Sequence, residues 1–149
     1  MNPALKRKIV EAAVPLFASQ GYYKTTTAQI AESAGVTQPY LYLFFDTKER
    51  LYLAALDAAE RRITDAVSAS AAFPDDLLQG IEAEYRNDLR LILQSFAIAE
   101  PEIRTRTSSA FNAVYAAVTE RFERQGSAVP DRAAQRLIGQ AYIRLIARV

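Results

Sequence analysis

Hydrophobic residues recur every three or four positions along almost the whole chain, which is the spacing of one helix face packed on a core. No stretch alternates between apolar and polar residues for long enough to predict a β-strand. The 5 glycines and 6 prolines fall mostly between the periodic segments and so separate them from one another. The pattern therefore predicts an all-α protein.

The chain opens with an amphipathic helix, expected from about Pro3 to Gln20, and Gly21 stands where its C-terminal cap would be. A second, short helix is expected after Thr26, because Gln29 three residues later completes a capping box. This helix is expected to stop at Gly35, since glycine is the usual residue just past a helix end.

A third short helix follows at once, capped by Thr37 and reaching Phe44 or Phe45. Gly35 suits the left-handed backbone that a tight turn between the second and third helices requires. Two short helices joined by a turn of three or four residues are typical of a helix-turn-helix. A generic tight helical hairpin is the weaker alternative for this segment.

A long fourth helix is expected to link this N-terminal unit to the rest of the chain. It begins after Asp46 or Thr47, and its apolar stripe predicts a helix over residues 48–70. We therefore expect two domains, one over residues 1–47 and a helical one over residues 48–149.

The second domain is predicted to be a bundle of further helices. A stretch of small residues at 68–74 ends in proline and indicates a hinge. Apolar periodicity then resumes, with a break expected near Asn87–Asp88, and Pro101 forces a helix boundary at the residue before it. A last apolar stripe runs over residues 137–149, and if it is left uncovered it favours association with another chain.

Composition narrows the classes of function that remain. Half of the 149 residues are hydrophobic, 23% are charged and the formal net charge is +1, as in an ordinary soluble globular protein. Any DNA binding therefore needs a local patch of positive charge, because the whole chain is not basic. The chain has no histidine and no cysteine, which excludes a Ser-His-Asp enzyme and histidine or cysteine metal sites. We expect neither a cofactor nor a metal.

An enzyme is a weak alternative. The chain has no glycine-rich phosphate loop, and acidic pairs such as Asp75–Asp76 are typical of solvated helix faces. A cleft that holds a carboxylate of raised pKa would favour an enzyme. No apolar run reaches the length of a membrane span, and no apolar signal core follows the N-terminus, so we expect a cytoplasmic protein without a membrane partner.

The segment over residues 21–51 resembles the DNA-binding signature of the TetR family of bacterial transcriptional regulators. The residues that carry the resemblance are Gly21-Tyr22, Thr25-Thr26, Ile30-Ala31, Ala34-Gly35-Val36-Thr37, Leu41-Tyr42 and Lys48-Glu49-Arg50-Leu51. The resemblance covers about the first third of the chain. This sequence departs from the family pattern at Pro39, where glycine is usual, and at Phe44, where histidine is common.

The resemblance implies a three-helix DNA-binding head whose third helix enters the major groove. The residues implied to contact DNA are Thr26, Thr37, Gln38, Pro39, Tyr40, Tyr42 and Lys48. Residues at the start of a recognition helix reach base edges, so we assign Gln38 and Tyr40 to base reading. Tyr42 and Lys48 are assigned to phosphate contacts, which position the protein without reading sequence.

The resemblance also implies that the C-terminal bundle binds a small effector and forms a homodimer. The residues expected to line the effector site are Tyr85, Phe96, Phe111, Asn112 and Tyr115. Core packing is the alternative for each of them, and an apolar or aromatic effector is expected. Relative to the family pattern the chain is short by one or two helices, so we expect either a truncated C-terminus or an unusual dimer interface.

These features together predict a sequence-specific transcriptional regulator, acting as a ligand-responsive repressor and binding double-stranded operator DNA as a homodimer. The alternative is a helical protein-interaction module that does not bind DNA. Salt-sensitive duplex binding distinguishes the two, because phosphate contacts make affinity fall steeply with salt.

Overall fold

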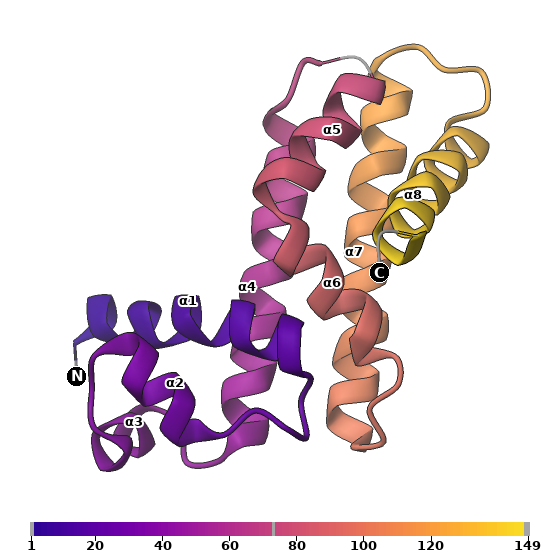
Figure 1. Cartoon of the computed structure of the whole chain (residues 1–149). Helices are drawn as coiled ribbons and strands as arrows, with labels where there is room; N and C mark the ends of the chain where they lie inside the picture. Colours follow the sequence, from indigo (N-terminus) through magenta and orange to yellow (C-terminus); the bar gives the residue numbers. More distant parts are fainter. Residues whose placement is uncertain (1, 73, 148–149) are drawn as a thin grey trace.

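The computed structural model describes residues 2–72 and 74–147, and in this part of the chain it contains eight α-helices and no strand (Figure 1). In chain order the helices are α1 (Pro3–Gln20), α2 (Thr27–Ala34), α3 (Gln38–Phe44), α4 (Lys48–Ala69), α5 (Pro74–Glu84), α6 (Arg86–Ser95), α7 (Pro101–Arg124) and α8 (Pro130–Ala147). The all-α prediction is confirmed, and the expected start and end of the first helix are those observed.

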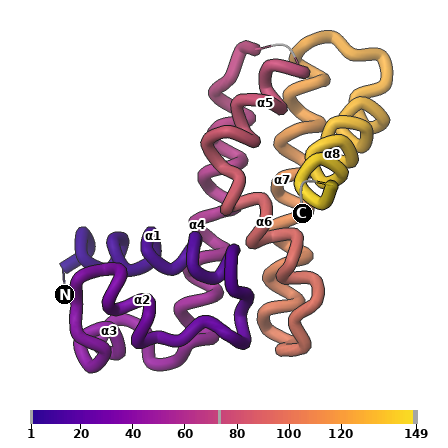
Figure 2. The backbone as a smooth tube through the Cα atoms, viewed as in Figure 1, coloured from indigo at the N-terminus to yellow at the C-terminus, as the bar shows by residue number. Residues whose placement is uncertain are grey.

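The helices form a small head and a larger body that share α4. In Figure 2 the three N-terminal helices lie together at one end, while α4 leaves this head and stands beside α7 in the body. Helix α4 packs against α7, α6 and α1, so it contacts both units along its length. Helix α8 covers α7 on the side away from the head (Figure 1).

The core runs without interruption from the head into the body. Phe17 of α1 and Tyr52 of α4 have no exposed surface, and their ring centroids lie 4.8 Å apart at 76°. The Tyr52 hydroxyl lies 2.5 Å from the hydroxyl of Ser95 on α6, which itself donates to the Leu91 carbonyl. A single aromatic side chain therefore joins the first, fourth and sixth helices.

A buried arginine caps the C-terminal end of α4. Arg121 of α7 is 2% exposed, and its guanidinium donates to the carbonyl oxygens of Val67, Ser70 and Ala72. The carbonyls at a helix C-terminus lack partners within the helix and carry partial negative charge, so a cation stabilises this end. Burial lowers the pKa of Arg121 from its ordinary value, as expected for a cation withdrawn from water.

One sequence prediction needs correction in the body, and another lies partly outside the described residues. The helix break expected near Asn87–Asp88 lies at Tyr85, because the polar pair belongs to the first turn of α6, where an acidic residue favours the helix N-terminus. The predicted hinge contains Phe73, which lies outside the described residues, and α4 continues into it as far as Ala69.

The last apolar stripe is covered by the chain itself. Its buried members are Ala134, Leu137, Ala141 and Leu145, which face the other helices of the body. The outward face of α8 instead exposes Ile143 and Ile146, which are 66% and 59% accessible. Val149, also part of the predicted stripe, lies outside the described residues.

Asp88 is a nearly buried carboxylate whose ionisation opposes folding. Its side chain is 3% exposed, and Arg62 is its ion-pair partner at 3.7 Å. Burial raises the pKa of Asp88 above the ordinary 3.8, and the attraction to Arg62 offsets only part of this effect. The folded state therefore holds the Asp88 proton more tightly than the unfolded state does. This contribution to stability is smallest above the raised pKa and grows as pH falls toward 3.8.

We expect Asp88→Asn to be more favourable relative to wild type at neutral pH than at pH 4, because the amide carries no charge to bury. Urea denaturation of both proteins across this pH range measures the difference in their free energies of unfolding. The exposed Asp76→Asn on α5 serves as control and should show no such trend. A difference between the Asp88 variant and wild type that is constant with pH would contradict the assignment.

Candidate nucleic-acid interface

Local capping interactions fix the ends of α2 and α3, the two crossed helices of the head. The Thr26 hydroxyl accepts from the Gln29 amide N–H at 3.1 Å, and the Gln29 side-chain carbonyl accepts from the Thr26 N–H at 3.1 Å. This is the predicted capping box. Gly35 ends α2 with φ 72° and ψ 29°, a left-handed conformation that glycine adopts without steric cost.

Helix α3 begins where the sequence predicts and presents its first turn to solvent. The Thr37 hydroxyl accepts from the Tyr40 N–H at 3.3 Å. Pro39 lies in the first turn, where its missing N–H costs no helical hydrogen bond. Leu41 is fully buried and anchors α3 to the head core, whereas Gln38 is exposed beside Pro39 and Tyr40. The structure therefore brings the sequence-predicted base-reading residues to one free edge.

A residue that sequence reasoning missed connects α2 to this edge. Thr27 is 7% exposed, and its hydroxyl accepts from the Gln38 side-chain amide at 2.9 Å. The same Thr27 oxygen lies 2.9 Å from the Tyr42 hydroxyl. Thr27 thus holds Gln38 and Tyr42 together, and no sequence spacing could reveal this, because the contact depends on the crossing of two helices.

Lys48 lies at the start of α4, with its ammonium turned toward the head. Its nitrogen lies 4.6 Å from the centre of the Tyr22 ring and 3.4 Å from the Tyr23 carbonyl oxygen, to which it donates. Burial, followed by the nearby charges of Glu100 and Glu49, raises the pKa of Tyr22 to about 12. The phosphate contact predicted for Lys48 therefore stays a prediction, and it would compete with these contacts within the chain.

Further cations surround the start of the head. The Lys6 ammonium lies 5.5 Å from the centre of the Phe45 ring, and Arg7 pairs with Glu11 at 3.7 Å. Lys8 and Lys24 are exposed on α1 and on the turn before α2. Such a local group of cations can supply phosphate attraction that the nearly neutral chain as a whole does not.

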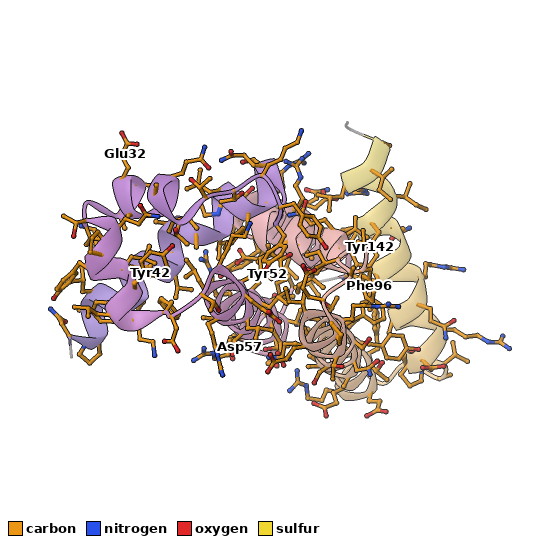
Figure 3. The ribbon with its side chains drawn as sticks, turned by 90° about the horizontal axis from the view of Figure 1, so that it is seen from below. Glu32, Tyr42, Tyr52, Asp57, Phe96 and Tyr142 are labelled. Atoms are coloured by element: carbon orange, nitrogen blue, oxygen red, sulfur yellow. The ribbon has the colours of Figure 1, made fainter. Side chains whose placement is uncertain are left out.

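Three of the five residues predicted to bind an effector, Phe96, Phe111 and Tyr115, belong to one group of aromatic side chains. Phe111 stacks on Tyr142 at 6.2 Å and contacts the rings of Phe96 and Tyr115. Seen from below, Phe96 lies beside Tyr142 of α8, and both are far from Tyr42 in the head (Figure 3). This aromatic group is partly open to solvent, since Phe96 is 49% exposed.

Tyr85 and Asn112 lie outside this aromatic group, and the hydroxyl of Tyr115 is already hydrogen-bonded within the chain. Tyr85 sits under the Arg62 guanidinium, 5.5 Å from its ring centre, and Asn112 is exposed. The Tyr115 hydroxyl donates to Asp131, and this bond raises the pKa of Tyr115. Their role in effector binding stays a prediction.

An apolar cavity of about 40 Å³ lies in the body, among α4, α5, α6, α7 and α8. Its lining residues are Ile63, Val67, Leu78, Ile81, Leu89, Val114, Val118, Leu137, Ile138, Ala141 and Tyr142. The sequence pattern placed these side chains in helical stripes but could not separate cavity walls from ordinary core. None of the five residues predicted to bind an effector is among them.

The head therefore has the arrangement of a helix-turn-helix, and comparison with known proteins agrees. Residues 9–55 match the family described as bacterial regulatory proteins, tetR family. The similarity to the TetR family therefore covers the head and the first part of α4. Within the described residues, no helix has both the length and the apolar character that a membrane crossing requires.

Two curated relatives are similar over different lengths. The HTH-type transcriptional activator FasR of Mycolicibacterium smegmatis is 26% identical over 142 residues, which are 89% of this chain and 65% of that protein. The HTH-type transcriptional regulator RutR of Escherichia coli strain K12 is 43% identical over 53 residues, 36% of this chain and 25% of that protein. The chain thus matches less than two thirds of either relative.

The overall arrangement of helices also matches a solved structure. A transcriptional regulator of the "TerR/AcrR family" from Aquifex aeolicus has a TM-score of 0.73 and 18% identity, over 97% of this chain and 86% of that chain. At this identity the likeness concerns the fold, and it extends through the body, which the family match over residues 9–55 leaves out.

Proposed function

We propose that this protein is a cytoplasmic, sequence-specific transcriptional regulator that acts as a ligand-responsive repressor and binds operator DNA as a homodimer. The observation that carries the proposal is the first turn of α3. Gln38, Pro39 and Tyr40 are exposed there on a helix that Leu41 anchors from behind. Residues at this position of a recognition helix reach base edges in the major groove. The family match over the head supports the same role.

Contacts within the head divide into reading and positioning. Gln38 can pair with adenine through its amide, and Tyr40 offers an exposed ring beside it. Tyr42, 43% exposed, and the capping residues Thr26 and Thr37 would contact phosphates. Thr27 would hold Gln38 in place before DNA arrives, which reduces the ordering cost of binding.

A homodimer would place two recognition helices in successive major grooves, roughly 34–36 Å apart on a pseudo-palindromic site. The outward face of α8 supports such an association, since Ile143 and Ile146 lie one turn apart and are exposed. Sedimentation of wild type and of Ile143→Glu tests this face, and a lost dimer is the expected outcome.

The effector response would travel through α6, which contacts both the cavity and the head. Leu89 of α6 lines the cavity, and Gln94 near its end donates to the Phe17 carbonyl of α1 at 2.6 Å. Just beyond α6, the Tyr23 hydroxyl of the head donates to Glu100 at 2.7 Å. A ligand that shifts α6 would change these contacts, by no more than its differential affinity for the two arrangements.

The test is duplex binding by fluorescence anisotropy, using DNA that flanks the protein's own gene and excess random competitor. We expect competitor-resistant binding that weakens steeply with salt. Gln38→Ala should reduce the ratio of specific to non-specific affinity by about 5- to 100-fold, because one bidentate base contact is lost. Tyr42→Ala should weaken binding to all duplexes alike, because phosphate contacts carry no sequence information.

Gln79→Ala, on an exposed site of α5, is the matched control and should bind as wild type does. Equal losses of specific and non-specific binding in the Gln38 and Tyr42 variants would contradict the division between reading and positioning. Salt-insensitive binding, or none by a dimeric protein to any duplex, would favour the protein-interaction module. A promoter reporter then gives the direction of regulation, since the relative FasR is named an activator.

A further inference from the structure

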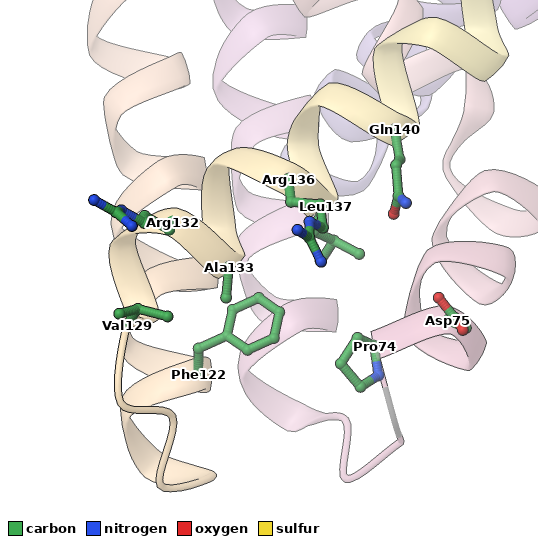
Figure 4. Close-up of a pocket in the computed structure, with 9 residues that line it drawn as sticks. All are labelled: Pro74, Asp75, Phe122, Val129, Arg132, Ala133, Arg136, Leu137 and Gln140. Atoms are coloured by element: carbon green, nitrogen blue, oxygen red, sulfur yellow. The ribbon is translucent and has the colours of Figure 1, made fainter.

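A groove of about 530 Å³ opens at the end of the body farthest from the head (Figure 4). It lies between the start of α5, the end of α7 and the start of α8. Phe122 forms its apolar floor, and Arg132, Arg136 and Gln140 line it from α8. Asp75 lines it from α5, so the lining contains two arginines and one aspartate.

The groove continues the same interhelical space as the apolar cavity. On α7, Val118 of the cavity is followed one turn later by Phe122 of the groove. On α8, Leu137 lines both spaces, and it is 6% exposed. Leu137 is therefore shared by an outer groove that carries two arginines and an inner, largely aliphatic cavity.

The inner cavity alone is too small for a ligand. Its volume of about 40 Å³ is far below the ~300–1,000 Å³ of small-molecule pockets, whereas the groove, at about 530 Å³, lies within that range. Rotation of the Leu137 side chain would join the two into one site. That site would be apolar and aliphatic at its inner end and positively charged at its mouth.

We propose that this joined site binds an amphiphilic anion, with the anionic head at Arg136 and Arg132 and an aliphatic tail passing Leu137. Arg136 lies beside Leu137, whereas the Arg132 side chain extends to the side of α8 away from Asp75 and would have to turn to reach the same head group (Figure 4). The inner lining includes only one polar residue, Tyr142, so the tail carries no charge. The inference rests on the proposed function in one respect, that this ligand is the effector of the regulator.

The test measures ligand binding by calorimetry in the absence of DNA, with ligands kept well below micelle formation. Decanoate should bind at least ten-fold more tightly than decyltrimethylammonium. Affinity should rise by about four-fold for each methylene from hexanoate to decanoate, as expected for burial of the tail. Decyl phosphate distinguishes a phosphate head from a carboxylate head, and tighter binding of either anion than of the cation supports the site.

Arg136→Gln, at an exposed position, should lower the affinity for decanoate by about three- to ten-fold and leave the affinity for decanol unchanged. Arg104→Gln, on an exposed part of α7 away from the groove, is the matched control and should have no effect. Tighter binding of the cation, no dependence on chain length, or equal effects of the two arginine variants would each overturn the proposal.

The anisotropy assay separates this inference from the proposed function. Specific DNA binding by a protein that fails to bind decanoate or decyl phosphate overturns the inference alone. Binding of decanoate by a protein that does not bind DNA confirms the ligand site and contradicts the proposed function as a transcriptional regulator. With both activities present, decanoate should change the operator affinity of wild type at a ligand concentration about three- to ten-fold lower than the Arg136→Gln variant requires.

Discussion

Phe17→Ala is expected to lower the free energy of unfolding by about 3–5 kcal/mol, the usual cost of removing a buried aromatic ring. Phe17 has no exposed surface, and its ring packs edge-on against Tyr52 at 4.8 Å and lies 6.3 Å from Tyr22. The cavity left by alanine would open between the head and α4, where the neighbouring rings cannot collapse into it. Urea denaturation followed by circular dichroism measures the loss.

Phe96→Ala is the matched control, since it removes the same ring from a position that is 49% exposed. Its expected cost is about 1 kcal/mol or less, as for most changes at the surface. Equal losses in the two variants would contradict the view that Phe17 joins the head to the body.

Arg121→Met is expected to cost about 2–4 kcal/mol, because carbonyl oxygens near the end of α4 lose their donors. Methionine keeps an unbranched apolar stem but has no group that can donate to the carbonyls of Val67, Ser70 and Ala72. The relief from removing a buried charge offsets part of this loss, since burial already lowers the pKa of Arg121. The free energy of unfolding in urea, together with helix content, measures the effect.

Arg124→Met offers the comparison one turn away on the same helix. Arg124 is exposed, and among the described residues it donates to the Ser68 carbonyl, at 3.5 Å, so its replacement should cost about 0.5 kcal/mol or less. A small loss for Arg121→Met would mean that water replaces the guanidinium at the end of α4.

The head was predictable from sequence because its signals are local. A capping box links Thr26 to a residue three positions away, and Gly35 fixes the turn by its own backbone conformation. The same holds for Thr37 and for Pro39 in the first turn of α3. Each of these signals depends on a few neighbouring residues, so none requires knowledge of how distant helices pack.

The candidate sites were only partly predictable because they depend on packing between distant segments. Thr27 reaches Gln38 through the crossing of two helices. On α7, Phe111 and Val114 follow the same apolar periodicity, yet of these two only Val114 lines the apolar cavity. Which face of α7 borders a cavity depends on α5 and α8, and the periodicity of one helix carries no information about that choice.

The shared core has a practical consequence for chimeric regulators in which one protein's reading head is grafted onto another's sensor. A joint at residue 47 would separate the ring of Phe17 from Tyr52, its partner on α4. A graft beginning beyond Leu56 keeps that pair intact. The new body would still have to provide two hydrogen-bonding partners for the head. In this protein Glu100 accepts from the Tyr23 hydroxyl, and Gln94 donates to the Phe17 carbonyl. The position at which two such proteins can be fused is therefore set by side-chain packing between α1 and α4, and the loop before α4 is an unsuitable fusion point.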